Sequence, residues 1–462
     1  MRQLTPQNRE RLIFGLPAVI AGVAALFIGR PSVLGIIALL LAIGFTAWKP
    51  MIGWVLTVLA YPFIYLQLFV GGSVNVPYVD LFAMITAVGL AAHLAWQWKY
   101  GRPSSLAKGK LNLPGILPFV LFIAAAALSL IHVADLGGGV KFLFRPLTFF
   151  YLMFIALPAF VIDRPKRLFT TLRVMFVVGC IAAAMGAWSL VFPLDPGGLR
   201  RAVPIIVYGM TPLGTNHNLI AEVLVSIIPI GMVLALFASG AVRRWYVVGT
   251  VLFGVVTLLT FSRNGWLTLA VEGVVLLIAI AKLYGWSWKR IARYAVPAVA
   301  VVLIAIGAFS MTSVARSSNT NRMRLTEIAL EQFLDHPFIG GGVGTFREVV
   351  GRDRWYVADF GEPQEAHGLI QKLLAETGIL GLTAFLALLA AIVRYIIRVY
   401  RSTASTPQWR VILLALLCST FGSIVFQLFN TSYFVSKLWL PLGIAVAAAR
   451  LAERGIALRE AP

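Results

Sequence analysis

The sequence predicts an all-α, polytopic membrane protein, and three observations support this prediction. First, 60% of the 462 residues are hydrophobic and only 12% are charged, which is more apolar side chain than a soluble domain can bury. Second, apolar runs of about 20 residues, the length that spans a bilayer, recur along the chain. Third, basic residues recur in short groups between these runs, as the positive-inside rule expects. We therefore expect a single integral membrane domain over residues 1–462.

The apolar runs number about fourteen, with twelve or thirteen as the alternative. They cover residues 12–29, 33–48, 51–70, 78–96, 113–131, 146–162, 168–192, 218–239, 245–261, 265–283, 293–312, 378–397, 411–428 and 433–450. The first run follows MRQLTPQNRERLIFG and has no small-residue cleavage site after it, so we expect a retained helix there.

Loop charge predicts the orientation of these spans. With the N-terminus in the cytoplasm, every inner connection is basic, and the outer loops GGSVNVP and HVADLGGG carry no Lys or Arg. We expect both termini in the cytoplasm. The formal net charge of +21 then reflects membrane orientation, and we expect no nucleic-acid partner.

A few cations lie on the outer side, against this bias. They are Lys141, Arg145, Arg200, Arg201, Arg263 and the arginines of the large outer loop, residues 313–366. Guanidinium groups match phosphate oxygens in shape and charge, so these residues indicate a binding site for an anionic lipid headgroup. Contact with ordinary phospholipid headgroups is the alternative, and for Arg263, in FSRNGWL, it would be a simple interfacial anchor.

Two of these groups have informative spacing. Arg200 and Arg201 are adjacent, which suits a diphosphate, and Asn216, His217 and Asn218 then open the next span. Lys141 and Arg145 are four residues apart and therefore lie on one helical face.

The large outer loop predicts an amphipathic surface helix at NRMRLTEIALEQFLDHP. Asn321 would cap it, and Met323, Ile328, Leu330 and Phe333 would supply its apolar contacts. The IGGGVGTF segment that follows has no strand before it, so it predicts a tight backbone turn and not a nucleotide loop.

Metal and disulfide chemistry are not expected. The five histidines form no ligand pair at helical spacing, although a cation site built from Asp353, Asp359 and Glu362 is an alternative. Cys180 and Cys418 lie inside apolar runs, which argues against a disulfide framework.

The stretch EAHGLIQKLLAETGILGL places Glu365, His367 and Lys372 directly before an apolar run. A histidine can take a proton from a hydroxyl near neutral pH. Beside arginines that hold a diphosphate, His367 would make the site a transferase. A purely structural histidine at a helix start is the alternative.

Several elements together resemble the O-antigen ligase and polymerase superfamily over roughly residues 200–440. They are His367-Gly368 with Gly378 and Gly381, Arg263 with Leu267, HPFIGGGVGTF at 336–346, Arg324 a dozen residues earlier, and Asn218 with Ala221. The family usually has Asn, Ser or Gln where this chain has Gly368.

The resemblance implies a GT-C-type membrane glycosyltransferase in a bacterial inner membrane, with its active site periplasmic and without metal or other cofactor. The donor would be an undecaprenyl-diphosphate-linked glycan, and the acceptor a glycan or the lipid A core. His367 would be the base, and Arg201 and Arg263 would hold the diphosphate with help from Arg200, Arg324 or Arg145. Lys141 and Asn218 would complete the substrate site, with membrane lipids around it. These motifs do not separate a ligase from a polymerase.

A lipid-linked oligosaccharide flippase or another transporter is the rival hypothesis. Transporters carry ionisable groups within their spans, and Glu222 and Glu272 lie inside predicted spans. A passive scaffold would explain neither His367 nor the outer arginines.

Overall fold

The computed structural model describes residues 33–70, 74–100, 113–193, 199–283, 285–402, 406–431 and 433–458, and its fold is that of an all-α polytopic membrane protein. In chain order the first half contains α2 (Val33–Trp48), α3 (Pro50–Ala60), β1 (Gln67–Val70), β2 (Val74–Pro77), α4 (Tyr78–Lys99), α5 (Ile116–Ser129), the 3-10 turn η1 (Leu130–His132), α6 (Leu136–Phe142), the π-helical segments η2 (Leu143–Phe149) and η3 (Tyr151–Ala156), α7 (Leu157–Val161) and α8 (Pro165–Val191).

The second half contains longer helices. They are α9 (Asn218–Phe237), α10 (Gly240–Leu259), α11 (Arg263–Leu283), α12 (Trp288–Ser310), α13 (Ser313–Asp335), α14 (Phe346–Arg352), α15 (Arg354–Phe360), α16 (Leu369–Arg401), α17 (Pro407–Gln427) and α18 (Ser436–Glu453).

In the described part of the chain, eight helices are long and apolar enough to cross a membrane, or nine if one bent pair counts as a span. Helices α11 and α18, which match the predicted spans 265–283 and 433–450, are not among the eight. The predicted span 12–29 lies outside the described residues. The number of about fourteen spans therefore stays a prediction.

Two predicted spans are wrong in their boundaries. The helix expected over 51–70 ends at Ala60, since Pro62 has no backbone N–H to continue the helical hydrogen bonds, and an antiparallel β1–β2 hairpin follows. Pro50 also ends α2, and the chain bends by 117° between Leu40–Trp48 and Pro50–Ala60. The span expected at 146–162 begins ten residues earlier, because α6, η2, η3 and α7 form one apolar helix over Leu136–Val161.

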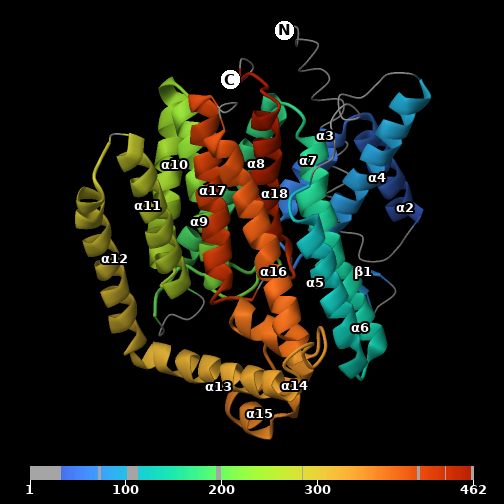
Figure 1. Cartoon of the computed structure of the whole chain (residues 1–462), viewed down its shortest axis with the longest axis vertical. Coiled ribbons are helices and arrows are strands. Elements are labelled where there is room, and N and C mark those ends of the chain that lie inside the picture. Colours follow the sequence, from blue (N-terminus) through green and yellow to red (C-terminus); the bar gives the residue numbers. More distant parts are fainter. Residues whose placement is uncertain are drawn as a thin grey trace.

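The buried core lies among α8, α9, α16, α17 and α18. Side chains are buried along nearly all of α9 and α18, whereas Ile291 is the buried residue of α12. Figure 1 shows α12 at the edge of the bundle, leading into α13.

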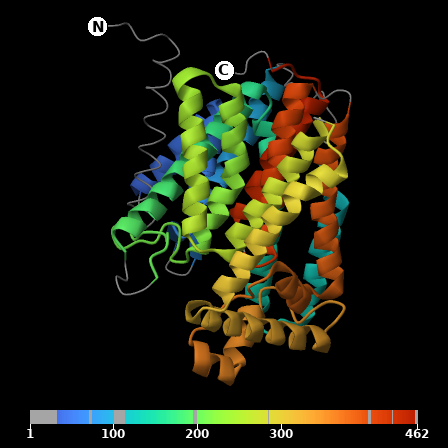
Figure 2. The same ribbon diagram turned by 90° about the vertical axis from the view of Figure 1, so that its left-hand side faces the viewer.

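Helix α13 lies across the ends of the long helices, with α14 and α15 beside it (Figures 1 and 2). We call this the α13 end of the bundle. The predicted surface helix is confirmed, but it begins at Ser313, so Asn321 is inside the helix and does not cap it. Met323 and Leu330 are exposed and Ile328 is buried. These three helices share a small apolar cluster that includes Leu325, Ile328, Phe346 and Tyr356.

Candidate functional site

Three arginines surround His217 at the α13 end. Arg201 lies in the loop before α9, Arg263 begins α11, and Arg322 is in α13. Burial, and then the charges of Arg201, Arg322 and Arg263, lower the pKa of the His217 imidazole from 6.5 to about 3. Because a charge shifts a pKa strongly only at short range, the three arginines lie near the His217 imidazole. We call Arg201, Arg263 and Arg322 the arginine cluster.

The positive charge of this cluster is not neutralised by the protein. In the described part of the chain, Arg145, Arg324 and Arg398 pair with carboxylates, but no member of the arginine cluster does. Burial lowers the pKa of Arg201, and burial with the charge of Arg263 lowers that of Arg322 to about 10. Both groups stay charged at neutral pH, so the cluster is suited to bind an anion.

Backbone contacts place Arg201 beside the end of α10. The amide of Ala202 donates to the carbonyl of Leu259 at 2.9 Å. The amide of Val203 donates to Ser189 Oγ at 2.9 Å. The loop that carries Arg201 is therefore held between α8 and α10, next to the turn that leads to Arg263. Arg200, its neighbour, is exposed to solvent.

Asn218 joins the start of α9 to the start of α11. Its Oδ1 accepts a hydrogen bond from Ser262 Oγ at 2.7 Å, and Ser262 Oγ accepts one from the amide of Gly265 at 3.2 Å. The Arg263 Nη1 then donates to Ser310 Oγ at the end of α12 at 2.9 Å and to Asn319 Oδ1 in α13 at 2.5 Å. Asn218 is buried, so it positions Arg263 and His217.

Arg322 is a site residue that the sequence motif did not indicate. It lies one helical turn from Asn319, and its Nε is buried without a hydrogen-bond partner among the described residues. Helical spacing could have indicated that Arg322 faces inward, because it precedes the buried residues Leu325 and Ala329 by three and seven positions. The motif had indicated Arg324.

Arg324 has a different environment. Its guanidinium pairs with Asp353 and with Glu327 at 3.1 Å, and it lies over the Trp355 ring at 5.3 Å. The hydrogen bond that Asp353 accepts from the Tyr356 amide, together with the pairing to Arg324, lowers the pKa of Asp353 against the opposing effect of burial. Arg324 therefore holds α13 against α15, and Asp353, one of the three acids considered for a cation, is already paired.

His367 lies at the entry to α16, within range of Arg322. Burial and the charge of Arg322 lower the pKa of its imidazole to about 4, so the ring is neutral at pH 7. Its Nε2 lies 3.3 Å from Gln364 Oε1, which also accepts from Asn321 Nδ2 at 3.2 Å. A carbonyl oxygen can only accept, so the network assigns the proton to Nε2. Nδ1 is then free to take a proton from a substrate.

Glu365, which lies just before α16, and Lys372, which lies in its first turn, have structural partners. Lys372 is fully buried, and its Nζ donates to Glu365 at 2.5 Å and to Glu376 at 2.6 Å. The rings of Phe142, Phe346 and Phe434 lie around the same ammonium group, 5.4–5.8 Å away. This buried pairing fixes the backbone that presents His367.

The two glycine motifs pack against each other. Helix α16 breaks at Gly378, which has φ 62° and ψ −164°. The amides of Ile379 and Leu380 donate to the carbonyls of Pro337 and Phe338 at 2.9 and 3.2 Å. A Cβ at Gly340 or Gly378 would overlap the facing backbone. The predicted tight turn at 339–346 is therefore a docking segment for the break in α16.

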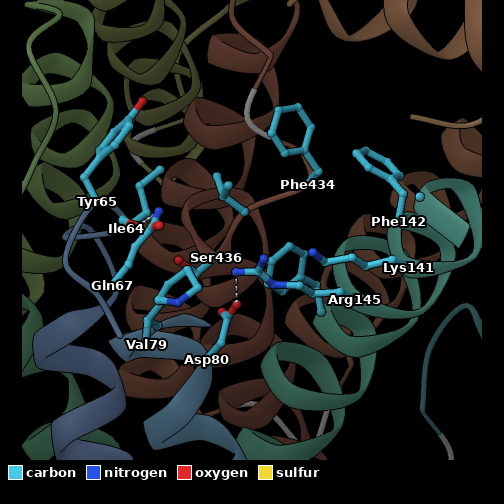
Figure 3. Close-up of a pocket in the computed structure, with 14 residues that line it drawn as sticks. Ile64, Tyr65, Gln67, Val79, Asp80, Lys141, Phe142, Arg145, Phe434 and Ser436 are labelled. Carbon is cyan, nitrogen blue, oxygen red and sulfur yellow. Dashed lines mark hydrogen bonds and ion pairs between the residues drawn. The ribbon is translucent and has the colours of Figure 1, made fainter. Parts of the chain in front are cut away.

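Lys141 and Arg145 line a separate cavity next to this site (Figure 3). Arg145 Nη2 donates to Asp80 Oδ2 at 3.3 Å. The expectation that Lys141 and Arg145 share one side of a helix agrees with this shared cavity. The structure does not place them among the arginines around His217.

The two acids in predicted spans differ from each other. Glu222 pairs with Lys437 at 3.2 Å and accepts a hydrogen bond from Gln427 at 2.9 Å. Both carboxylate oxygens of Glu272 are buried without a partner among the described residues. Glu272 is thus the feature that favours the transporter hypothesis.

The fold and the site define a class, a helical membrane protein with a cation-rich, histidine-bearing site at one end of its bundle. Residues 248–386 match the family model described as O-antigen ligase. This match confirms the predicted resemblance to the O-antigen ligase and polymerase superfamily over the segment that holds Arg263, Arg322 and His367. Arg201 and His217 precede the matched segment. No curated protein matches the chain.

Proposed function

We propose that the protein is a membrane glycosyltransferase that moves a glycan from an undecaprenyl-diphosphate carrier to an acceptor hydroxyl. The supporting observation is that Arg201, Arg263 and Arg322, none paired with an acid in the described residues, lie near His217, and that Arg322 also lies near His367. The acceptor is the lipid A core in a ligase or a growing glycan in a polymerase.

The arginine cluster binds the diphosphate of the donor. A lipid diphosphate carries at least two negative charges, and three guanidinium groups offer it several charge-assisted hydrogen bonds. Arg322 takes the role that the motif had assigned to Arg324, since Arg324 is held by carboxylates. Arg200, which is exposed beside Arg201, adds positive charge at the entrance.

The transfer step is a displacement at the anomeric carbon. The acceptor oxygen forms a bond to that carbon, and the bond from the carbon to the phosphate oxygen breaks. The leaving diphosphate keeps the electron pair and is stabilised by the arginine cluster. His367 Nδ1 takes the acceptor proton. The bond energy of the glycosyl diphosphate drives transfer, so no nucleotide is needed.

Donor binding itself prepares the base. In the empty site, burial and Arg322 hold the pKa of His367 near 4. A bound diphosphate offsets the field of the arginines, and this raises the pKa of His367 towards its ordinary value. His367 therefore becomes a stronger base when the donor is in place.

The charge pattern supports a side of the membrane for the reaction. Basic connections at the opposite end of the bundle favour a cytoplasmic location for that end, and we assign both termini to the cytoplasm. The α13 end is then periplasmic in a bacterial inner membrane, and the loop 313–366 covers the site.

The test uses the purified full chain with an undecaprenyl-diphosphate-linked glycan and an acceptor. Formation of a larger glycan together with free lipid diphosphate, also in the presence of EDTA, is the expected result. His367→Ala should abolish transfer. His93→Ala is the matched control, because His93 lies in α4 and contacts Ala47 near the opposite end. Wild-type transfer by His367→Ala would contradict the base assignment.

A flippase would give a different result. It would move the lipid-linked glycan across a vesicle bilayer without forming a new glycosidic bond, and Glu272→Gln would impair that movement. Formation of a new glycosidic bond without translocation indicates a transferase, and translocation without a new bond indicates a flippase.

A further inference from the structure

A cavity lies next to the site, and the proposed transfer step does not use it (Figure 3). Its volume is about 350 Å³, within the range of about 300–1,000 Å³ that is usual for small-molecule sites. The α3–β1 connection, the start of α4, the α6–η2 helix and the α17–α18 connection form its walls. We call it the α6 pocket.

The charged lining of the α6 pocket favours an anion. Asp80 is buried, and Arg145 donates a hydrogen bond to it at 3.3 Å. Lys141 lies on the same helix and points into the cavity on the side of Arg145 (Figure 3). Lys141 makes no ion pair within the described residues. Arg145 and Asp80 neutralise each other, so the ammonium group of Lys141 is left for a ligand.

The remaining lining is aromatic and polar. The rings of Tyr65, Phe142 and Phe434 border the cavity, and those of Phe142 and Phe434 are 6.0 Å apart. The electron-rich face of an aromatic ring attracts polarised C–H groups, which a sugar ring presents on its own faces. Gln67 adds an amide whose Nε2 donates to the Ile64 carbonyl at 3.2 Å, which leaves Oε1 for a hydroxyl donor.

The α6 pocket borders both segments that carry the candidate histidines. A Cβ at Gly214, three residues before His217, would contact the Tyr65 ring. Phe434 lies 5.4 Å from Lys372 Nζ, which binds Glu365, two residues before His367. A glycan whose reacting end lies at His367 can therefore extend into this pocket.

We propose that the α6 pocket binds one residue of the glycan substrate, a sugar that carries a carboxylate or phosphate group, and that Lys141 selects for that charge. The aromatic rings hold the sugar ring, and Asp80 and Gln67 accept from its hydroxyls. The identity of the ligand as a glycan rests on the proposed function. The position of an anion at Lys141 rests on the geometry of the pocket.

Binding by calorimetry tests this inference without any transfer reaction. The full chain in nanodiscs of zwitterionic lipid is titrated with an oligosaccharide that contains a hexuronic acid and with its carboxyl-reduced form. We expect the acidic form to bind about tenfold more tightly, with a preference that weakens as salt is added. Lys141→Gln should remove this preference and Lys141→Arg should keep it.

The matched control is Lys289→Gln, an exposed lysine at the start of α12, far from the pocket. It should leave the preference for the acidic form as in the wild type. Equal affinity for the two oligosaccharides, or a preference that survives Lys141→Gln, would overturn the proposal. Loss of the preference in nanodiscs that contain phosphatidylglycerol would identify a lipid headgroup as the occupant and would also overturn it.

Transfer assays then locate the acidic sugar. One arm pairs an acidic donor with a neutral acceptor, and the other pairs a neutral donor with an acidic acceptor. Lys141→Gln should raise the KM of the acidic substrate about tenfold in only one of these arms, which identifies the source. If no glycan is transferred but Lys141 still governs acid binding, the proposed function fails and the pocket assignment stands. If glycan is transferred but Lys141→Gln changes neither binding nor KM, the pocket assignment fails and the proposed function stands.

Discussion

Arg263 Nη1 donates a hydrogen bond to Asn319 Oδ1 at 2.5 Å, and this contact joins the first residue of α11 to the helix that lies across the bundle. The same guanidinium nitrogen donates to Ser310 Oγ. Arg263 is thus held in place by neutral oxygens, which orient it and leave its charge for an anion.

The first prediction concerns this contact. Asn319→Leu removes the acceptor, so Arg263 loses its orientation and the KM for the lipid-linked donor should rise about tenfold, with a smaller change in kcat. Thr320→Ala, at an exposed neighbouring position, should leave both constants near the wild-type values. Unchanged donor KM in Asn319→Leu would show that α13 does not position Arg263.

The second prediction separates two arginines of α13. Arg322→Gln removes a charge of the arginine cluster and should weaken donor binding by about tenfold to a hundredfold, with little change in the unfolding temperature. Arg324→Gln should have the opposite profile, because it breaks the ion pair with Asp353 that holds α15. Measuring donor Kd and thermal unfolding of both variants decides between them. Weaker donor binding in Arg324→Gln alone would restore the motif-based assignment.

The third prediction is the pH dependence of transfer. With a pKa of about 4 in the free enzyme, His367 is neutral above that pH, so kcat/KM should hold to well below pH 6.5 before its acid limb begins. A bound diphosphate raises this pKa, so the acid limb of kcat should lie at higher pH. In Arg322→Gln a positive charge is removed, protonation becomes easier, and the acid limb of kcat/KM should move upward. If the acid limb of kcat/KM lies at the same pH in the wild type and in Arg322→Gln, Arg322 does not influence the pKa of His367.

The fourth prediction concerns the buried Lys372. Lys372→Met leaves the buried carboxylate of Glu376 and the partly exposed carboxylate of Glu365 without their cation, which should cost about 3–5 kcal/mol of stability. Adding Glu376→Gln should recover part of this loss. The exposed pair of Arg352 and Glu348 is the control. Arg352→Met should lower the free energy of unfolding by less than about 1 kcal/mol. Thermal unfolding in one detergent compares Lys372→Met, the double variant with Glu376→Gln, and Arg352→Met. Equal losses of stability in Lys372→Met and Arg352→Met would show that burial does not strengthen the Lys372 pairing.

The fifth prediction compares two glycines with similar positive φ angles. Gly340 has φ 75° and faces the backbone of Glu376, whereas Gly361 has φ 77° with open space around it. Both alanine variants should lose some stability from the positive φ. Gly340→Ala should lose more, together with transfer activity, because the docking segment must move away from the break in α16. Equal stability and activity in the two variants would argue against this docking.

The sequence predicted the class of fold and most helix positions, because apolar runs of membrane-spanning length do not depend on their neighbours. It also predicted the surface helix and the tight turn. It missed the end of α3 at Ala60 and the early start of the helix at Leu136, since proline placement and π-helical turns change boundaries without changing hydropathy. Arg201, Arg263 and His367 were selected as site residues from their position and residue type, and their catalytic roles stay predictions.

Only the tertiary structure decided which charges share one site. Arg322 and Arg324 are two residues apart and identical in type, yet one faces His217 and His367 and the other binds Asp353. Lys372 could have been a substrate ligand from its position, but two carboxylates and three phenylalanine rings enclose it. Hydropathy is a property of a segment and is readable along the chain. The pairing of a charge depends on which distant segments approach it, and only the packed helices determine that.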